Sequence, residues 1–128
     1  MVYKTETLEL AASCLAVALY GEAGSNFHNQ AYIYNVIMNR SNNRIEKVCD
    51  TIYKKHQFEY ITLVQKGKKD FPNKKDFLEF KLIAIKFLTK QKGYNINPVG
   101  SATHFHDTRV KNPWGYPLKY AVNNLRFY

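Results

Sequence analysis

Cysteine and tryptophan are scarce in this sequence, and the scarcity excludes several kinds of site. The only cysteines are Cys14 and Cys49, and neither belongs to a paired CxxC motif. A zinc ribbon and a thioredoxin-like redox motif are therefore excluded. Two cysteines in 128 residues do not establish a disulfide framework, so we expect two buried thiols, with a disulfide between them as the alternative.

Long hydrophobic runs are also missing. The apolar stretch at 10–20 is far too short to span a bilayer. It follows Glu6 and Glu9, and Lys4 is the only positive side chain ahead of it, which argues against a signal peptide. We therefore expect a core helix here, no stable membrane insertion, and synthesis in a cytoplasm without an export signal.

Acidic residues are few, with ten Asp and Glu against nineteen Lys and Arg, giving a net charge of +9. Such an excess favours a polyanionic partner, which is a nucleic acid, an anionic membrane or an anionic cell envelope. The basic loop at 66–75 lacks stacking aromatics at regular spacing, and no helix-turn-helix or RNA-binding signature accompanies it. We therefore expect an anionic cell-envelope surface as the partner and no nucleic acid.

One carboxylate interrupts an apolar helical pattern. Apolar residues recur every three or four positions, which predicts an amphipathic helix, at Leu8, Ala11, Ala12, Leu15, Ala16 and Leu19. The next position of this stripe is Glu22, shortly before Gly24. Burial disfavours the charged form of a carboxyl group and keeps its proton for a leaving group, so Glu22 is a candidate general acid. The alternative is a helix-terminal Glu that turns into solvent.

The remaining segments predict one α+β domain over 1–128. Apolar patterning predicts helices at 30–40, 45–53 and 76–91, an extended segment at 56–60, and an exposed loop at 66–75. The helix at 30–40 is apolar on nearly all sides and should be central. Extended pieces at 101–107 and 120–128 close the chain. Helices first and strands last indicate an α+β fold.

Two histidines and the single tryptophan are further candidates for binding. His104 and His106 flank Phe105, so both imidazoles face one side of a strand. With His28, His56 or Asp107 they are a possible zinc half-site, but no HExxH motif is present. We favour hydrogen bonding to a polar ligand, with no metal and no other cofactor. Trp114 serves either as packing or as a flat surface for a sugar ring.

Taken in order, the motifs resemble those of the SleB/CwlJ cell-wall hydrolase family, the spore-cortex-lytic type also found among phage lysins. The matching pieces are LYGEA at 19–23, Gln30 with NVIMNR at 35–40, VCDTIY at 48–53 with QF at 57–58, Gly93, GSATHFH at 100–106, NPW at 112–114 and NLRFY at 124–128. Two features depart from the family. Asn123 and Leu125 stand where its closing motif often has Gly and His, and the loop at 66–75 has no counterpart.

The resemblance implies a lysozyme-like fold, mainly helical with a small C-terminal antiparallel β part. It also implies cleavage of the β-1,4 bond between N-acetylmuramic acid and N-acetylglucosamine in peptidoglycan, with Glu22 as the acid. The substrate-binding positions that it implies are Gln57, Phe58, Thr103, His104, His106 and Trp114.

Three functional hypotheses remain at this point. One convincing carboxylate fits a lytic transglycosylase that leaves 1,6-anhydro ends, whereas a lysozyme-type muramidase needs a second carboxylate. The second hypothesis is a zinc-dependent N-acetylmuramoyl-L-alanine amidase that uses His104 and His106. The third is a non-catalytic module that binds walls or nucleic acid. We expect a monomer that acts on peptidoglycan glycan strands, as a phage endolysin released at lysis or a virion-borne lysin.

Overall fold

The computed structural model describes the chain at residues 5–54, 58–107, 120–122 and 125–127, and its side chains at 7–54 and 58–105. The helical elements in this part are α1 (Thr5–Glu22), α2 (Phe27–Arg40), the 3-10 turn η1 (Ile45–Lys47), α3 (Val48–Tyr53), α4 (Glu59–Gln65) and α5 (Lys74–Leu88). Asn26 caps α2 and Asn73 caps α5, each accepting a hydrogen bond from a backbone N–H three residues on. Gly24, at φ 62°, takes the chain out of α1.

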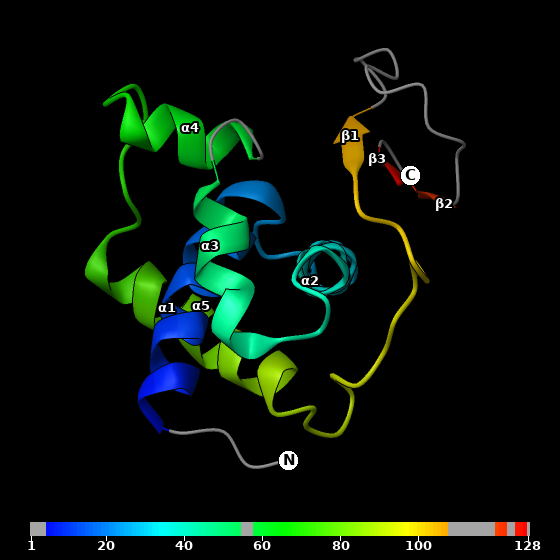
Figure 1. Ribbon diagram of the computed structural model, residues 1–128. Helices are drawn as coiled ribbons and strands as arrows, with labels where there is room; N and C mark the ends of the chain where they lie inside the picture. The colour runs from blue at the N-terminus through cyan, green and yellow to red at the C-terminus, as the bar shows by residue number, and fades with distance from the viewer. Residues whose placement is uncertain (1–4, 55–57, 108–119, 123–124, 128) are drawn as a thin grey trace.

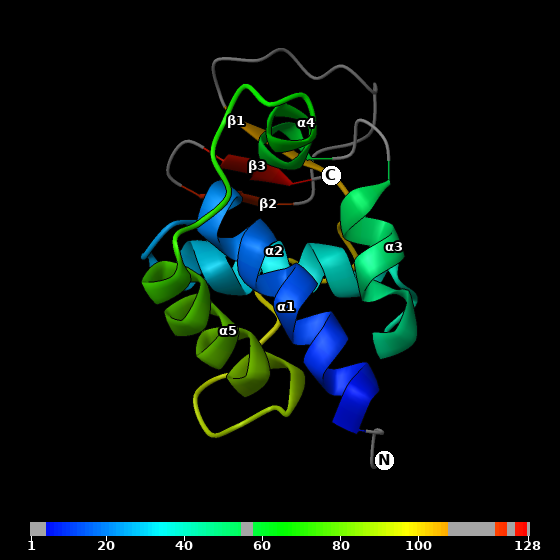
Figure 2. The same ribbon diagram turned by 90° about the vertical axis from the view of Figure 1, so that its left-hand side faces the viewer.

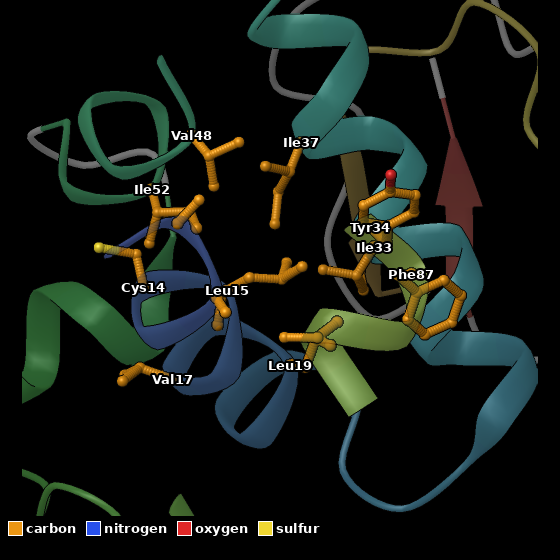
Figure 3. Close-up of a cluster of buried hydrophobic side chains, with 14 of the residues drawn as sticks. Cys14, Leu15, Val17, Leu19, Ile33, Tyr34, Ile37, Val48, Ile52 and Phe87 are labelled. Carbon is orange, nitrogen blue, oxygen red and sulfur yellow. The ribbon is translucent and has the colours of Figure 1, made fainter. Parts of the chain in front are cut away.

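Helix α1 is at the centre of the molecule. It packs most extensively against α5 and also contacts α2, α3 and α4 (Figures 1 and 2). Nine consecutive residues of α2, 30–38, are buried, which confirms the prediction of a central helix there. The core forms where these helices meet, and Figure 3 shows it with Cys14, Leu15, Val17, Leu19, Ile33, Tyr34, Ile37, Val48, Ile52 and Phe87.

The short helix α4 replaces the extended segment that the sequence predicted, so that prediction was wrong for Glu59 and Tyr60. Its sequence, EYITLVQ, is rich in β-branched and aromatic residues, which favour strands by local propensity. Tertiary packing decides otherwise, because Tyr60 and Ile61 are buried against the core. In Figures 1 and 2, α4 and the strands lie beyond the C-terminal end of α1.

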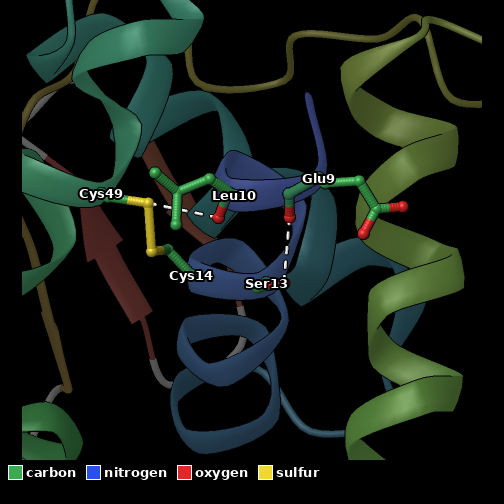
Figure 4. Close-up of a disulfide and its surroundings, with 5 residues drawn as sticks. All are labelled: Glu9, Leu10, Ser13, Cys14 and Cys49. Carbon is green, nitrogen blue, oxygen red and sulfur yellow. Dashed lines mark hydrogen bonds between the residues drawn. A yellow bond between two sulfur atoms is a disulfide. The ribbon is translucent and has the colours of Figure 1, made fainter. Parts of the chain in front are cut away.

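Cys14 and Cys49 form a disulfide, so the expectation of two free buried thiols was wrong. The bridge joins the middle of α1 to the first turn of α3 across a sequence separation of 35 residues (Figure 4). The sequence could not decide this pairing, because it does not show that the two helices bring the Cα atoms to 5.4 Å.

Helices build this fold, and the α+β class expected from the sequence is corrected to a helical one. The expected C-terminal β part does not form a layer beside the helices. In the described residues only three-residue segments are extended and paired: β1 (Phe105–Asp107), β2 (Tyr120–Val122) and β3 (Leu125–Phe127), in the antiparallel order β1-β3-β2. Strands of this length are at the short limit of those found in sheets. The described helices include none that is long and apolar enough to cross a membrane.

Candidate active site

Glu22 is the last residue of α1 and lies at the junction with α4. The apolar stripe of α1 continues into it, since Leu19, one turn earlier, is fully buried. The Glu22 side chain is half-buried, and its Oε1 accepts a hydrogen bond of 3.2 Å from the backbone N–H of Tyr60. This N–H belongs to the first turn of α4, where backbone donors have no partner within the helix. The helix pattern thus places a carboxyl group against a second helix instead of in open solvent.

The surroundings of Glu22 raise the pKa of its carboxyl group. Burial is the largest cause, and the nearby carboxylate of Glu59 adds to it. The Tyr60 N–H and the charge of Lys69 act in the opposite direction and lower the pKa, but burial prevails. A carboxyl group with a raised pKa keeps its proton closer to neutral pH, which is the property required of a general acid.

A glycine permits the close approach of α1 and α4. A Cβ added at Gly21 would overlap the Cγ and Cδ2 atoms of Tyr60 and come within 2.7 Å of its Cβ. The Tyr60 ring therefore lies directly on the backbone of α1, one residue before Glu22. Its hydroxyl donates a 2.6 Å hydrogen bond to the Asp70 carbonyl, and the ring packs edge to face with Tyr20. These contacts fix the position of the Tyr60 backbone N–H, which donates the hydrogen bond to Glu22.

A second group of side chains surrounds Phe58, the residue that precedes α4. Phe58 is 2% exposed, and the Arg40 guanidinium lies 5.4 Å from its ring centre. Phe105 packs against the same ring at 6.1 Å. Immediately before Phe105 in the chain, Thr103 Oγ1 and His104 Nδ1 are 2.9 Å apart. Burial, and then the charge of Arg40, lower the pKa of His104, which favours the neutral form of its imidazole.

The structure describes the side chains of only some of the predicted site residues. The described side chains are those of Glu22, Phe58, Thr103 and His104, while Gln57, His106 and Trp114 lie outside the described side chains. Glu22 is bonded to the backbone of Tyr60, two residues after Phe58. Arg40 lies over Phe58, and its charge acts on His104.

Sequence reasoning missed Tyr60 and Arg40. Arg40 closes the NVIMNR motif, which was a usable signal. Tyr60 lies in a segment whose helix was not predicted, so nothing in the sequence indicated its bond to Glu22.

Two of the cavities in the described part of the chain border α2. One, of about 220 Å³, adjoins this group and is lined by Arg40, Lys47, Asp50, Thr51 and Lys54. The other, of about 250 Å³, lies between the second half of α2 and the segment after α5, and none of the predicted site residues lines it. The described residues contain no group of three His, Cys, Asp or Glu side chains that could hold a metal ion.

A family model described as Cell Wall Hydrolase matches residues 24–128. The match begins two residues after Glu22 and includes Phe58, Thr103 and His104. No curated protein and no solved structure matches the sequence or the fold. Since the family model covers most of the chain, the protein belongs to the cell wall hydrolase family.

Proposed function

We propose that the protein degrades peptidoglycan by cleaving the β-1,4 bond between N-acetylmuramic acid and N-acetylglucosamine, with Glu22 as the general acid. The observation that carries this proposal is the Glu22 carboxyl group, whose pKa is raised by burial and which is held at the end of α1 by the Tyr60 N–H. A protonated carboxyl group can donate to the glycosidic oxygen as the bond to the anomeric carbon breaks.

The proposed reaction is that of a lytic transglycosylase. Glu22 first gives its proton to the glycosidic oxygen of the leaving glucosamine. The resulting carboxylate then takes the proton of the muramic acid 6-hydroxyl, whose oxygen bonds to the anomeric carbon. The product ends in a 1,6-anhydro sugar, no water is consumed, and Glu22 regains its proton.

Hydrolysis by a muramidase mechanism is the second candidate, because Glu59 supplies a second carboxylate near Glu22. Glu59 is exposed in the first turn of α4, and its charge raises the pKa of Glu22, so the two carboxyl groups interact. Glycosidases that use water commonly pair an acid with such a carboxylate. We favour the transglycosylase because Glu59 is open to solvent, whereas only Glu22 is partly enclosed.

The proposed substrate-binding residues are Phe58, Thr103 and His104, together with Gln57, His106 and Trp114. A neutral His104 can both donate and accept hydrogen bonds, which suits an N-acetylated sugar. The proposed setting is a monomer acting on glycan strands and the anionic cell envelope, as an endolysin released at lysis or a virion-borne lysin.

Mass spectrometry of fragments released from purified sacculi tests both the activity and the mechanism. Glu22→Gln should abolish release, because the amide keeps the shape but has no acidic proton to give. The control is the same substitution at Glu79, which is exposed on α5. Muropeptides ending in 1,6-anhydro-muramic acid, still formed by Glu59→Gln, support the transglycosylase. Reducing ends that Glu59→Gln abolishes establish the muramidase, and release by Glu22→Gln close to that of wild type rejects Glu22 as the acid.

A further inference from the structure

The cavity of about 220 Å³ beside the candidate active site is cationic. Its walls come from the last residue of α2, from η1, and from α3 with the residue that follows it. Arg40, Lys47 and Lys54 supply three positive charges, and Asp50 supplies one negative charge. The fifth lining residue, Thr51, is hydrogen-bonded to Ser41 at 2.8 Å and forms a fixed part of the wall. A surface recess with this charge balance favours an anionic ligand.

Arg40 is the strongest indication of a ligand. Its side chain is half-buried, and its guanidinium carbon lies over the Phe58 ring. Between described residues the ion pairs are Arg44 with Glu46 and Lys81 with Glu9, so no described carboxylate pairs with Arg40. A partly buried charge that pairs with no described carboxylate is stabilised by a bound anion. A planar guanidinium can offer two N–H groups side by side, which match the two oxygens of a carboxylate.

We propose that this cavity is a substrate subsite that binds a free carboxylate on the peptide branch of the peptidoglycan strand. Arg40 binds the carboxylate, and Lys47 and Lys54 add to the attraction. The inference rests on the proposed function, because it names the part of the same substrate that lies beside the cleaved bond. Its position follows from two contacts: Arg40 lies over Phe58, and α4, which begins immediately after Phe58, holds the N–H bonded to Glu22.

Asp50 distinguishes a peptide carboxylate from the phosphate of an anionic wall polymer. In a peptide, amide N–H groups stand close to the carboxylate, and Asp50 can accept a hydrogen bond from one of them. A phosphodiester chain has no amide N–H groups, and its phosphates are repelled by Asp50. The single acid among three cations therefore favours the peptide ligand.

Calorimetry on the Glu22→Gln protein tests the subsite without cleavage. The probes are a muramyl peptide with free carboxylates, the same peptide with those carboxylates amidated, and a glycerol phosphate oligomer. Lys47→Gln with Lys54→Gln, both exposed positions, and separately Arg40→Gln, should weaken binding of the free acid about tenfold or more. The control carries Lys66→Gln and Lys92→Gln, exposed lysines outside the cavity with the same loss of charge, and should bind as the parent does.

The amidated peptide should bind weakly to every variant, and circular dichroism should show that each variant is folded. Equal affinity for the free and amidated peptides overturns the proposal, and so does equal weakening by the cavity and control variants. Tighter binding of the glycerol phosphate oligomer, lost in the cavity variants, also overturns it and assigns the cavity to wall phosphate. Failure of the proposed function is seen separately, since the wild-type protein would then release no glycan fragments.

Discussion

At the scale of single residues, Glu22 links catalysis to stability. Burial favours its protonated form in the folded protein, so its pKa lies above the unfolded value of 4.5. The stability contributed by that proton is present below the unfolded pKa and is lost as pH rises through the folded pKa. Glu22→Gln does not titrate and still offers an oxygen to Tyr60. Its free energy of unfolding should therefore exceed that of wild type by an amount that grows from pH 4 upward and then levels off.

Urea unfolding between pH 4 and pH 8 measures this difference, with Glu79→Gln as the exposed control. Activity of the wild type should decline over the same interval, because the acid loses its proton. A difference in stability that stays constant with pH would show that folding does not raise the pKa of Glu22.

His104 should titrate at low pH. Burial is the first cause and the Arg40 charge the second, and both move its pKa below its ordinary value of 6.5. Proton NMR of the imidazole should show the midpoint below that value in wild type and at a higher pH in Arg40→Gln. The rise should be partial, because burial remains. An unchanged midpoint in Arg40→Gln would mean that the two side chains do not interact.

At the scale of elements, two glycines at the end of α1 provide opposite tests. Helix propensity alone predicts that Gly21→Ala stabilises α1 by about 1 kcal/mol. The structure predicts the reverse, since the new methyl group overlaps the Tyr60 ring, and overpacking of this kind costs roughly 1–3 kcal/mol. Because α4 must move away from Glu22, activity should fall with stability.

The matched control is Gly24→Ala. A Cβ at Gly24 meets nothing within 4 Å, but the residue has a φ of 62°, so only backbone strain of about 1 kcal/mol is expected. Thermal unfolding and lysis rate, measured together, separate the two effects. A stabilised and active Gly21→Ala protein would contradict the contact between α1 and α4.

The disulfide between α1 and α3 should stabilise the fold mainly by restricting the unfolded chain. For a separation of 35 residues the loop-closure estimate is about 3–4 kcal/mol. Replacing Cys14 and Cys49 together by Ala should lower the free energy of unfolding by that amount, and reduction of the wild type should have nearly the same effect. Denaturant unfolding with and without reductant provides the measurement. A loss below 1 kcal/mol would mean that packing, and not the bridge, holds α3 in place.

The elements that the sequence predicted are those with enough length to show a period. The helices α1, α2 and α5 each run for fourteen residues or more, and their apolar patterns predicted them with small errors at the ends. The seven residues of α4 span only two turns, which is too short for a helical apolar period to be seen. Its β-branched and aromatic residues therefore suggested an extended chain. The paired strands have three residues each, too few for alternation to indicate how much sheet forms.

The candidate site was predictable to the same extent. Glu22 stood out because it interrupts a long apolar stripe. Tyr60 and Arg40 did not, because their roles depend on contacts between residues that are 38 and 18 positions apart in the chain. Such contacts depend on how helices pack, and the pattern within one helix does not contain that information.

At the scale of the whole molecule, the net charge of +9 should act on encounter with the wall and not on chemistry. A large share of that charge lies on the segment at 66–75, where Lys68, Lys74 and Lys75 are exposed. Lys69 is different, because its charge reaches Glu22 and lowers the pKa of that group. Substitution of different lysines can therefore separate the effect of charge on encounter with the wall from its effect on the pKa of Glu22.

Changing Lys68, Lys74 and Lys75 to Gln should slow lysis of whole sacculi and weaken its dependence on salt. Attraction to an extended anionic surface is screened within about 8 Å at physiological ionic strength. Cleavage of short soluble glycans by the same variant should remain close to wild type, since the reacting groups are unchanged. Lys69→Gln should instead raise the pKa of Glu22 and shift the pH profile on soluble glycans, with little effect on the salt dependence of lysis. If the triple variant loses activity equally on sacculi and on soluble glycans, the loop acts within the cleft, and the separation between encounter and chemistry is wrong.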